Sequence, residues 1–270
     1  MRVALTIAGS DSGGGAGIQA DLKTFHAFGV FGTTAVTAVT AQNTLGVMGI
    51  HAVPAELVRA QIEAVALDLR SAACKTGMLA TRATVEVVAA AIRAEALPNV
   101  VVDPVMIATS GDRLLDPDAE DAITTALLPL ATLVTPNLDE AALLTGFAVE
   151  DVGGMERAAR SLVERGARAA LVKGGHLRGD TVTDVLFDGH ELRRWRRPRL
   201  RTRGAHGTGC TLSAAVAAGL ALTRPLGDAV EDALGYVHRA IAAAPGLGAG
   251  NGPLNHFVKA PGSRAPATSP

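Results

Sequence analysis

Short apolar runs alternate along the chain with longer segments in which apolar residues recur every three or four positions. The short runs predict buried strands, and the longer segments predict amphipathic helices. In residues 55–69, for example, we expect Leu57, Ile62 and Val65 to face the core. Strands are expected at residues 3–8, 33–40, 47–53, 74–77, 100–103, 133–135 and 169–173, and helices at 16–28, 55–69, 83–94, 119–127, 138–144, 155–165, 211–222 and 226–242. This alternation predicts an α/β fold with a central, mostly parallel sheet and helices on both faces.

The pattern changes after residue 180, where two strand-like runs flank Asp188-Gly189. Asp-Gly between such runs is a hairpin signal, so we expect residues 181–187 and 191–196 to add a late antiparallel edge. Residues 193–203 carry seven arginines around Trp195. We interpret them as a solvated edge rather than a nucleic-acid site, because charge on an edge strand prevents pairing with other chains.

The length of the chain allows one large domain or two small ones. The chain has 270 residues, of which 48% are hydrophobic, so it needs neither disulfides nor metal to form a core. We find no linker and expect a single domain over residues 1–258, followed by a disordered tail at 259–270 that is rich in proline and alanine.

Charge and cysteine content exclude several classes of protein. The net charge is −1 and only 3% of residues are aromatic, which argues against a nucleic-acid partner. The two cysteines and the scattered histidines have no zinc-site spacing. No apolar run is long enough to span a membrane and no signal peptide is recognisable, so we expect a cytoplasmic protein.

Candidate chemistry lies at the ends of the predicted strands, because ligands of open α/β sheets bind beyond the carboxyl ends of the strands. The glycine-rich segment 9–17 fits neither a dinucleotide fingerprint nor a P-loop, so it is either a tight turn or a ligand loop. Asp103 follows a strongly apolar strand. Its carboxylate could hold Mg²⁺, directly or through water, or cap a turn.

Two further junctions carry polar residues. Asn137 and Glu140 lie three positions apart at a helix start, where they could bind Mg²⁺ or form a capping box. Lys173 also ends a strand and is one of only four lysines, so it is either a phosphate ligand or a solvated loop residue.

Residues 206–211 form the most specific local motif, His-Gly-Thr-Gly-Cys-Thr. Its glycines allow backbone N–H groups to converge on an anion at the start of a helix. Cys210 would lie in the same field, which predicts a lowered thiol pKa. The alternative for Cys210 is simple packing within an alanine-rich helix.

Taken in order, these motifs resemble the hydroxymethylpyrimidine and hydroxymethylpyrimidine-phosphate kinases, which belong to the ribokinase-like superfamily. The resemblance runs from about residue 3 to residue 258. The matching segments are Thr6-Ile7-Ala8-Gly9-Ser10-Asp11, residues 14–25, Thr40-Ala41-Gln42-Asn43-Thr44, Lys75-Thr76-Gly77-Met78-Leu79, Asp103-Pro104-Val105-Met106, residues 110–115, Thr135-Pro136-Asn137, Lys173-Gly174-Gly175-His176, residues 206–213 and residues 252–257.

The resemblance implies a three-layer sandwich that uses ATP and Mg²⁺ in thiamine biosynthesis. The substrate would be 4-amino-5-hydroxymethyl-2-methylpyrimidine and then its monophosphate. Family members are often homodimers. By position, the resemblance implies that Gln42 would pair with the pyrimidine edge and that the pocket would also be lined by Gly9, Asp21, Met78 and Val105. The metal and phosphates would be held by Asp103, Asn137 and Glu140, and the nucleotide phosphates would also contact Lys173. The anion hole would consist of Gly207, Thr208 and Gly209, and the base would be Cys210.

Two other functions remain open from the sequence. One is a pyridoxal kinase of the same superfamily, and the other is a noncatalytic pyrimidine-binding protein. The complete anion-hole segment with Cys210 argues against the noncatalytic alternative.

Overall fold

The computed structural model describes residues 1–106, 114, 116, 118–202 and 204–261. Within them, nine strands form one sheet of order β3-β2-β1-β4-β5-β6-β7-β8-β9. The strands are β1 (Val3–Asp11), β2 (Phe31–Asn43), β3 (Gly46–Ala52), β4 (Ala73–Thr76), β5 (Val100–Val102), β6 (Leu133–Val134), β7 (Ala170–Val172), β8 (Thr181–Phe187) and β9 (Leu192–Pro198). Strands β2, β1, β4, β5, β6 and β7 pair in parallel in that order, and β3, β8 and β9 pair antiparallel. The predicted parallel sheet with a late antiparallel edge hairpin is confirmed.

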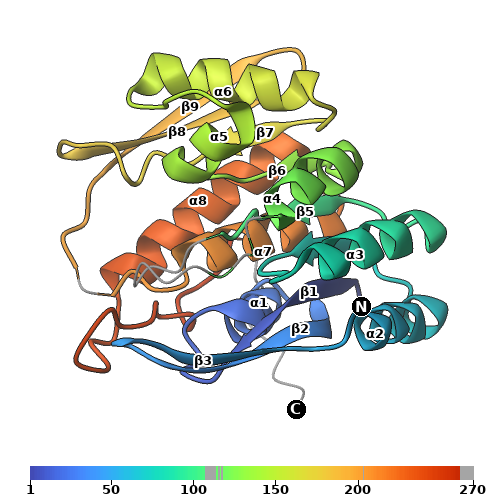
Figure 1. Cartoon of the computed structure of the whole chain (residues 1–270). Coiled ribbons are helices and arrows are strands. Elements are labelled where there is room, and N and C mark those ends of the chain that lie inside the picture. Colours follow the sequence, from blue (N-terminus) through green and yellow to red (C-terminus); the bar gives the residue numbers. More distant parts are fainter. Residues whose placement is uncertain (107–113, 115, 117, 203, 262–270) are drawn as a thin grey trace.

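Helices cover both faces of this sheet (Figure 1). They are α1 (Gly17–Ala27), α2 (Ala55–Leu69), α3 (Arg82–Ala94), α4 (Ala119–Ala122), α5 (Leu138–Thr145), α6 (Val152–Glu164), α7 (Thr208–Ala221) and α8 (Leu226–Ala242), with a π-helical turn at Ile123–Leu127 and a 3-10 turn at Leu128–Leu130. Residues of α1, α7 and α8 share one hydrophobic core with one face of the sheet, and α2 to α6 pack on the other face. The result is the predicted three-layer sandwich.

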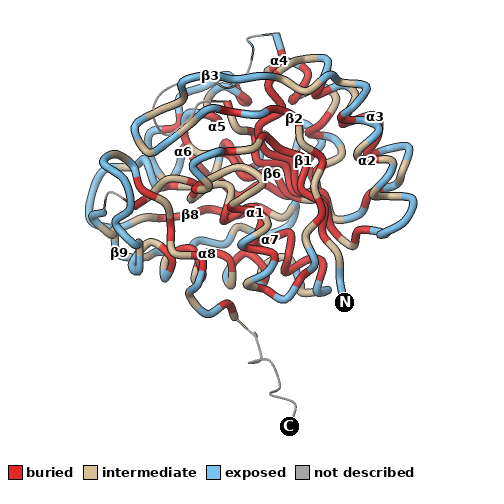
Figure 2. The backbone as a smooth tube through the Cα atoms, turned by 90° about the horizontal axis from the view of Figure 1, so that it is seen from below, coloured by how far each residue is buried: buried red, intermediate tan, exposed pale blue. Residues whose placement is uncertain are grey.

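The central strands and α7 are buried almost completely, as Figure 2 shows for the strands in red. Helix α7 contains mostly alanine and other small residues, and it is buried on nearly all sides. This composition permits close packing. A Cβ at Gly219 would lie 2.8 Å from the Ala229 Cβ of α8, so only glycine fits there. Tight packing of α7 fixes its N-terminus against the carboxyl ends of the strands.

The structure differs from the sequence expectations in three local features. The helix expected at residues 119–127 divides into α4 and the π-helical turn. Leu57 is 52% exposed, whereas Val58 and Ile62 are fully buried. Ile62 and Val65 contact the core as expected, but Val58 takes the place expected for Leu57, because apolar residues occur on both sides of the core face. Helix α7 begins at Thr208 rather than at residue 211, so the glycine motif forms its first turn.

Some predictions concern residues outside the described part of the chain. The motif at residues 110–115 lies there except for Leu114, and so do residues 262–270 of the expected tail. Within the described residues, no helix is long and apolar enough to cross a membrane.

Candidate functional site

A cavity of about 610 Å³ lies at the carboxyl ends of the parallel strands, facing the start of α7. This is the location that the strand-end residues predicted. The cavity is lined by twelve of the thirteen residues singled out from the sequence, namely Gly9, Gln42, Met78, Val105, Asp103, Asn137, Glu140, Lys173, Gly207, Thr208, Gly209 and Cys210. Residues distant in the chain are thus brought to one place by the parallel topology.

Asp21 is the exception and does not line the cavity. Its side chain is fully buried on the inner face of α1, where Oδ2 accepts hydrogen bonds from Thr6 Oγ1 at 2.6 Å and Lys75 Nζ at 2.9 Å. The expectation of a pocket-lining role is wrong, because the helix turns this residue toward β1 and β4. Asp21 instead holds Lys75, which does line the cavity.

A second charged cluster joins three strand ends. Lys173 Nζ lies 3.0 Å from Asp103 Oδ1 and 3.8 Å from Glu140 Oε2. Asp103 also accepts hydrogen bonds from Thr135 Oγ1 and Ser213 Oγ, each at 3.2 Å. Although burial opposes ionisation of Asp103, Lys173 holds the pKa of that carboxyl below its usual range.

Glu140 behaves differently from Asp103. Burial raises its pKa to about 7 despite the attraction of Lys173, and the charge of Asp103 adds to the increase. Glu140 and Asn137 also form the capping box, with Asn137 N donating to Glu140 Oε2 at 2.7 Å and Glu140 N donating to Asn137 Oδ1 at 2.9 Å. The capping alternative is therefore correct, and it leaves Glu140 Oε1 outside the box.

The carboxylates of this edge fit a magnesium ion that is shared with a ligand. Among the described residues, no group of three or more His, Cys, Asp or Glu side chains could hold a metal by itself. Asp103 and Glu140 supply hard oxygen atoms on either side of Lys173. Mg²⁺ commonly takes one or two carboxylates and completes its shell with water and substrate phosphates, so the donor set suits a metal–phosphate complex.

The start of α7 is a tight glycine turn that lines the cavity. Gly207 has a φ of 83°, and a Cβ there would lie 1.9 Å from the Gly15 carbonyl oxygen. Gly209 packs against the second cluster, since its Cβ would lie 3.2 Å from Lys173 Nζ. Among the described residues, no side chain caps this helix start. Thr208 N donates to the Ala205 carbonyl oxygen at 3.3 Å and Thr211 N to the Gly207 carbonyl oxygen at 2.9 Å. The N–H groups of Gly209 and Cys210 lie between these two donors and could bind an anion, with the helix dipole adding to the attraction.

Cys210 lies in this first turn and is half-buried. Burial raises its pKa to about 11, with Asp21 and Asp103 adding to the increase, while Lys75 and the Gly17 N–H group act in the opposite direction. The predicted lowering of the Cys210 pKa is wrong, because loss of hydration outweighs the field of the helix start. Cys74 is fully buried, and burial raises its pKa to about 12.

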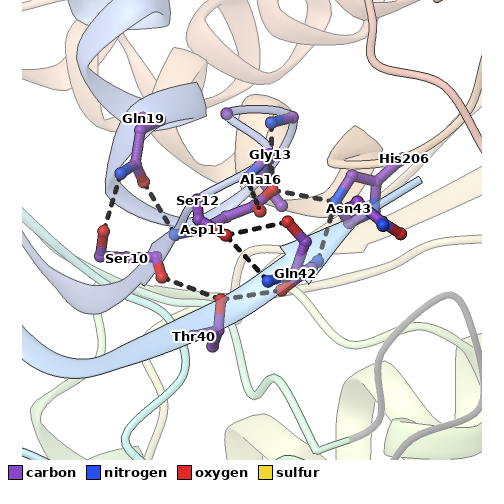
Figure 3. A network of polar contacts seen from close by, with 12 residues as sticks. Ser10, Asp11, Ser12, Gly13, Ala16, Gln19, Thr40, Gln42, Asn43 and His206 are labelled. Carbon is purple, nitrogen blue, oxygen red and sulfur yellow. Dashed lines mark hydrogen bonds and ion pairs between the residues drawn. The ribbon is translucent and has the colours of Figure 1, made fainter. Parts of the chain in front are cut away.

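A polar network that the sequence did not reveal joins β1, β2 and the loop before α7 (Figure 3). Asp11 accepts hydrogen bonds from the backbone N–H groups of Gly13, Gly15 and Ala16. Its Oδ2 also lies 3.0 Å from His206 Nε2, which in turn lies 3.2 Å from Gln42 Nε2. Both residues belong to motifs noted in the sequence, but their contact depends on tertiary structure.

The part of the cavity beside α8 is lined by apolar side chains and two arginines. Leu212 of α7 and Leu234, Val237 and Ile241 of α8 line it, together with Arg197 and Arg199. The expectation of a solvated arginine edge holds for Arg193, Arg194 and Arg196, which are exposed, but not for Arg197 and Arg199, which are half-buried. Alternation along β9 turns Arg197 toward the cavity, a signal that was present in the sequence. Arg199 follows the strand, and its guanidinium donates to the carbonyl oxygens of Gly175, Leu177 and Gly179.

Comparison with known proteins shows which family this chain resembles. A family model described as phosphomethylpyrimidine kinase matches residues 11–255. The chain is 56% identical over 258 residues to the hydroxymethylpyrimidine/phosphomethylpyrimidine kinase of Rhizobium meliloti, covering 94% of this chain and 97% of that protein. It is 48% identical over 256 residues to the thiamine biosynthesis bifunctional protein ThiED of Geobacter sulfurreducens, covering 95% of this chain and 52% of that protein.

Solved structures of several kinases have the same fold as this chain. A Bacillus subtilis pyridoxal kinase in an ADP complex superposes with a TM-score of 0.89 at 38% identity, covering 95% of this chain and 97% of that one. A Staphylococcus aureus pyridoxal kinase in complex with AMP-PCP and pyridoxal gives 0.87 at 34% identity, covering 95% and 94%. A phosphomethylpyrimidine kinase from Clostridium difficile gives 0.80 at 38% identity, covering 89% and 100%.

Proposed function

The chain belongs to the phosphomethylpyrimidine kinase family, and we propose that it transfers the γ-phosphate of ATP to the hydroxymethyl oxygen of 4-amino-5-hydroxymethyl-2-methylpyrimidine. The same site would then phosphorylate the monophosphate. The observation that carries this proposal is the meeting of the Asp103–Lys173–Glu140 cluster with the anion-binding start of α7 in one cavity. Phosphoryl transfer requires mainly positioning and stabilisation of charge, which these groups supply.

ATP would lie with its phosphates between Lys173 and the anion hole formed by Gly207, Thr208 and Gly209. Its base would enter the apolar slot beside α8, close to Arg197. Asp103 and Glu140, with Asn137 beside them, would hold Mg²⁺. When bound there, the ion would supply positive charge against the charge that develops on the transferring phosphoryl group.

The pyrimidine would lie at the other end of the cavity, against Gln42, Gly9, Met78 and Val105. Its hydroxyl oxygen forms a bond to the γ-phosphorus while the bond from that phosphorus to the bridging oxygen breaks, and ADP leaves with the electron pair. The hydroxyl proton passes to the Cys210 sulfur. Cys210 can accept this proton only as the thiolate, which is a minor form because the pKa of the thiol is raised to about 11. The rate should therefore rise with pH.

Pyridoxal is the second candidate substrate, since pyridoxal kinases superpose on this chain with TM-scores of 0.87 and 0.89. ADP release measured with the hydroxymethylpyrimidine, its monophosphate and pyridoxal separates the functions. We expect the highest kcat/KM for one of the two pyrimidines. A higher kcat/KM for pyridoxal would favour the pyridoxal kinase, and binding without any turnover would favour the noncatalytic protein.

We also propose that the chain forms a homodimer. Met48 and Ile50 are exposed apolar residues on one face of β3, the edge strand of the sheet, and exposed apolar side chains at such an edge can mark an interface. Sedimentation velocity at micromolar concentration should give the mass of two chains. A single species with the mass of one chain would contradict the homodimer.

A further inference from the structure

The side-chain amide of Gln42 lies between His206 and Thr40, and the structure raises the question of which amide atom faces each of them. In the structure its Nε2 faces His206 Nε2 at 3.2 Å, and its Oε1 faces Thr40 Oγ1 at 3.1 Å. The oxygen and nitrogen of a glutamine amide have nearly the same size, so a half-turn of the amide exchanges them without moving anything else. The hydrogen atoms of the neighbours therefore decide which orientation is stable.

The hydrogen on His206 is determined by Asp11. Burial acts to raise the pKa of Asp11, but hydrogen bonds from His206, Ala16 and Gly13 outweigh it and lower that pKa, so the carboxylate is ionised and can only accept. The 3.0 Å contact between His206 Nε2 and Asp11 Oδ2 then requires the proton on Nε2. A protonated Nε2 cannot accept a hydrogen bond from the Gln42 amide nitrogen.

Thr40 leads to the same conclusion from the opposite side. Its hydroxyl has one hydrogen, and Oγ1 lies 3.0 Å from the Ser10 carbonyl oxygen, which can only accept. When that hydrogen is directed to Ser10, Thr40 Oγ1 is an acceptor toward Gln42. Both neighbours are then satisfied if Gln42 turns Oε1 to His206 and Nε2 to Thr40, with the His206 hydrogen shared between Asp11 and Gln42.

We propose that His206 is a specificity-determining positioning residue that, together with Thr40, holds the Gln42 amide in this one orientation. The inference rests on the proposed function, in which Gln42 pairs with the substrate ring. One N–H and one oxygen lone pair of the amide stay free, in fixed order from the Thr40 side to the His206 side. That order matches one arrangement of donor and acceptor on the ring and opposes the reverse arrangement.

The 4-amino and 4-oxo forms of the substrate provide these two arrangements. The aminopyrimidine offers a ring-nitrogen acceptor beside an amino donor, whereas 5-hydroxymethyl-2-methylpyrimidin-4-one offers an N–H donor beside a carbonyl acceptor. With His206 present, the protein should bind the amino compound much more tightly. Without the His206 donor the amide can turn by half a revolution, and the preference should weaken.

The loop that carries His206 should tolerate its replacement. It is held by backbone contacts, with His206 N donating to the Gly252 carbonyl oxygen at 3.1 Å and Gly207 packed on Gly15. His206→Phe keeps a flat ring of similar size but removes the donor. His206→Gln restores a donor, because the Asp11 carboxylate accepts only and the new amide must turn its N–H group toward it. Thr40→Val removes the other constraint on Gln42 without changing the shape of β2.

The test measures the affinity ratio of the amino to the oxo compound by calorimetry, and the kcat/KM ratio by ADP release, in wild type and the three variants. We expect His206→Phe to lower both ratios at least tenfold, Thr40→Val to lower them in the same direction, and His206→Gln to restore much of the loss. The KM for ATP should stay close to wild type.

Unchanged ratios in His206→Phe and Thr40→Val would overturn the inference, and so would a fall that His206→Gln does not reverse. Failure of the proposed function gives a different result. In that case the wild type would turn over neither pyrimidine, while the calorimetric ratio would still report whether His206 orients the amide.

Discussion

Replacing Glu140 by glutamine should stabilise the protein at alkaline pH while impairing its use of magnesium. The change keeps an oxygen that can accept the hydrogen bond from Asn137 N, so the capping box survives. It removes only the charge. This substitution therefore distinguishes the structural role of Glu140, capping at the start of α5, from its functional role in the cavity.

The size of the effect follows from the pKa of Glu140, which burial raises from 4.5 to about 7. Since the folded protein binds this proton more tightly than the unfolded chain, stability is full below pH 4.5, falls as the pH rises and levels off above pH 7. Each pKa unit corresponds to about 1.4 kcal/mol, so ionisation of Glu140 costs on the order of 3 kcal/mol. Glu140→Gln removes that cost above pH 7.

Thermal or urea unfolding at pH 5 and pH 8 measures this difference. We expect the variant to exceed wild type by less than about 1 kcal/mol near pH 5 and by up to about 3 kcal/mol at pH 8. At pH 8 the variant should also require a several-fold higher Mg²⁺ concentration for half-maximal turnover. A variant that melts below wild type at pH 8 and keeps the wild-type Mg²⁺ dependence would refute this reasoning and leave Glu140 with capping alone.

Substitutions at three further positions test the site. Gln42→Leu should weaken binding of the pyrimidine by about tenfold or more and leave ATP binding nearly unchanged, because one buried partner is lost; equal losses by calorimetry would contradict the assignment. Cys210→Ala should lower kcat by about 100-fold or more, and Cys210→Asp should restore part of it with a rate that no longer rises toward pH 9; alkylation should modify Cys210 and spare Cys74, which is fully buried. Gly207→Ala should abolish turnover, because its Cβ would lie 1.9 Å from the Gly15 carbonyl oxygen; an active variant would exclude a tight turn there.

The predictable parts of the site are those with a local cause. Asp103 and Lys173 each follow a short apolar run, and parallel strands bring their carboxyl ends together, so sequence pattern and topology suffice to place them. The capping box of Asn137 and Glu140 was predictable for the same reason, since three residues of spacing determine its geometry.

The parts that sequence misjudged depend on burial by distant segments. Asp21 lies on the inner face of α1 because β1 and β4 cover it, and no spacing within α1 shows this. The Cys210 pKa rises because the surrounding elements exclude water from a thiol that the helix start would otherwise favour as thiolate. The contact between His206 and Asp11 spans 195 residues of chain and follows only from the completed fold.

The central claim is that one cavity transfers phosphate from ATP to the hydroxymethyl oxygen of an aminopyrimidine. Phosphorus NMR of the purified chain with Mg²⁺, ATP and 4-amino-5-hydroxymethyl-2-methylpyrimidine tests it directly. The account predicts loss of the ATP γ signal, appearance of ADP and a new phosphomonoester coupled to the methylene protons, all absent in Asp103→Asn. Stable ATP, or ADP formed with inorganic phosphate and no phosphomonoester, would contradict it.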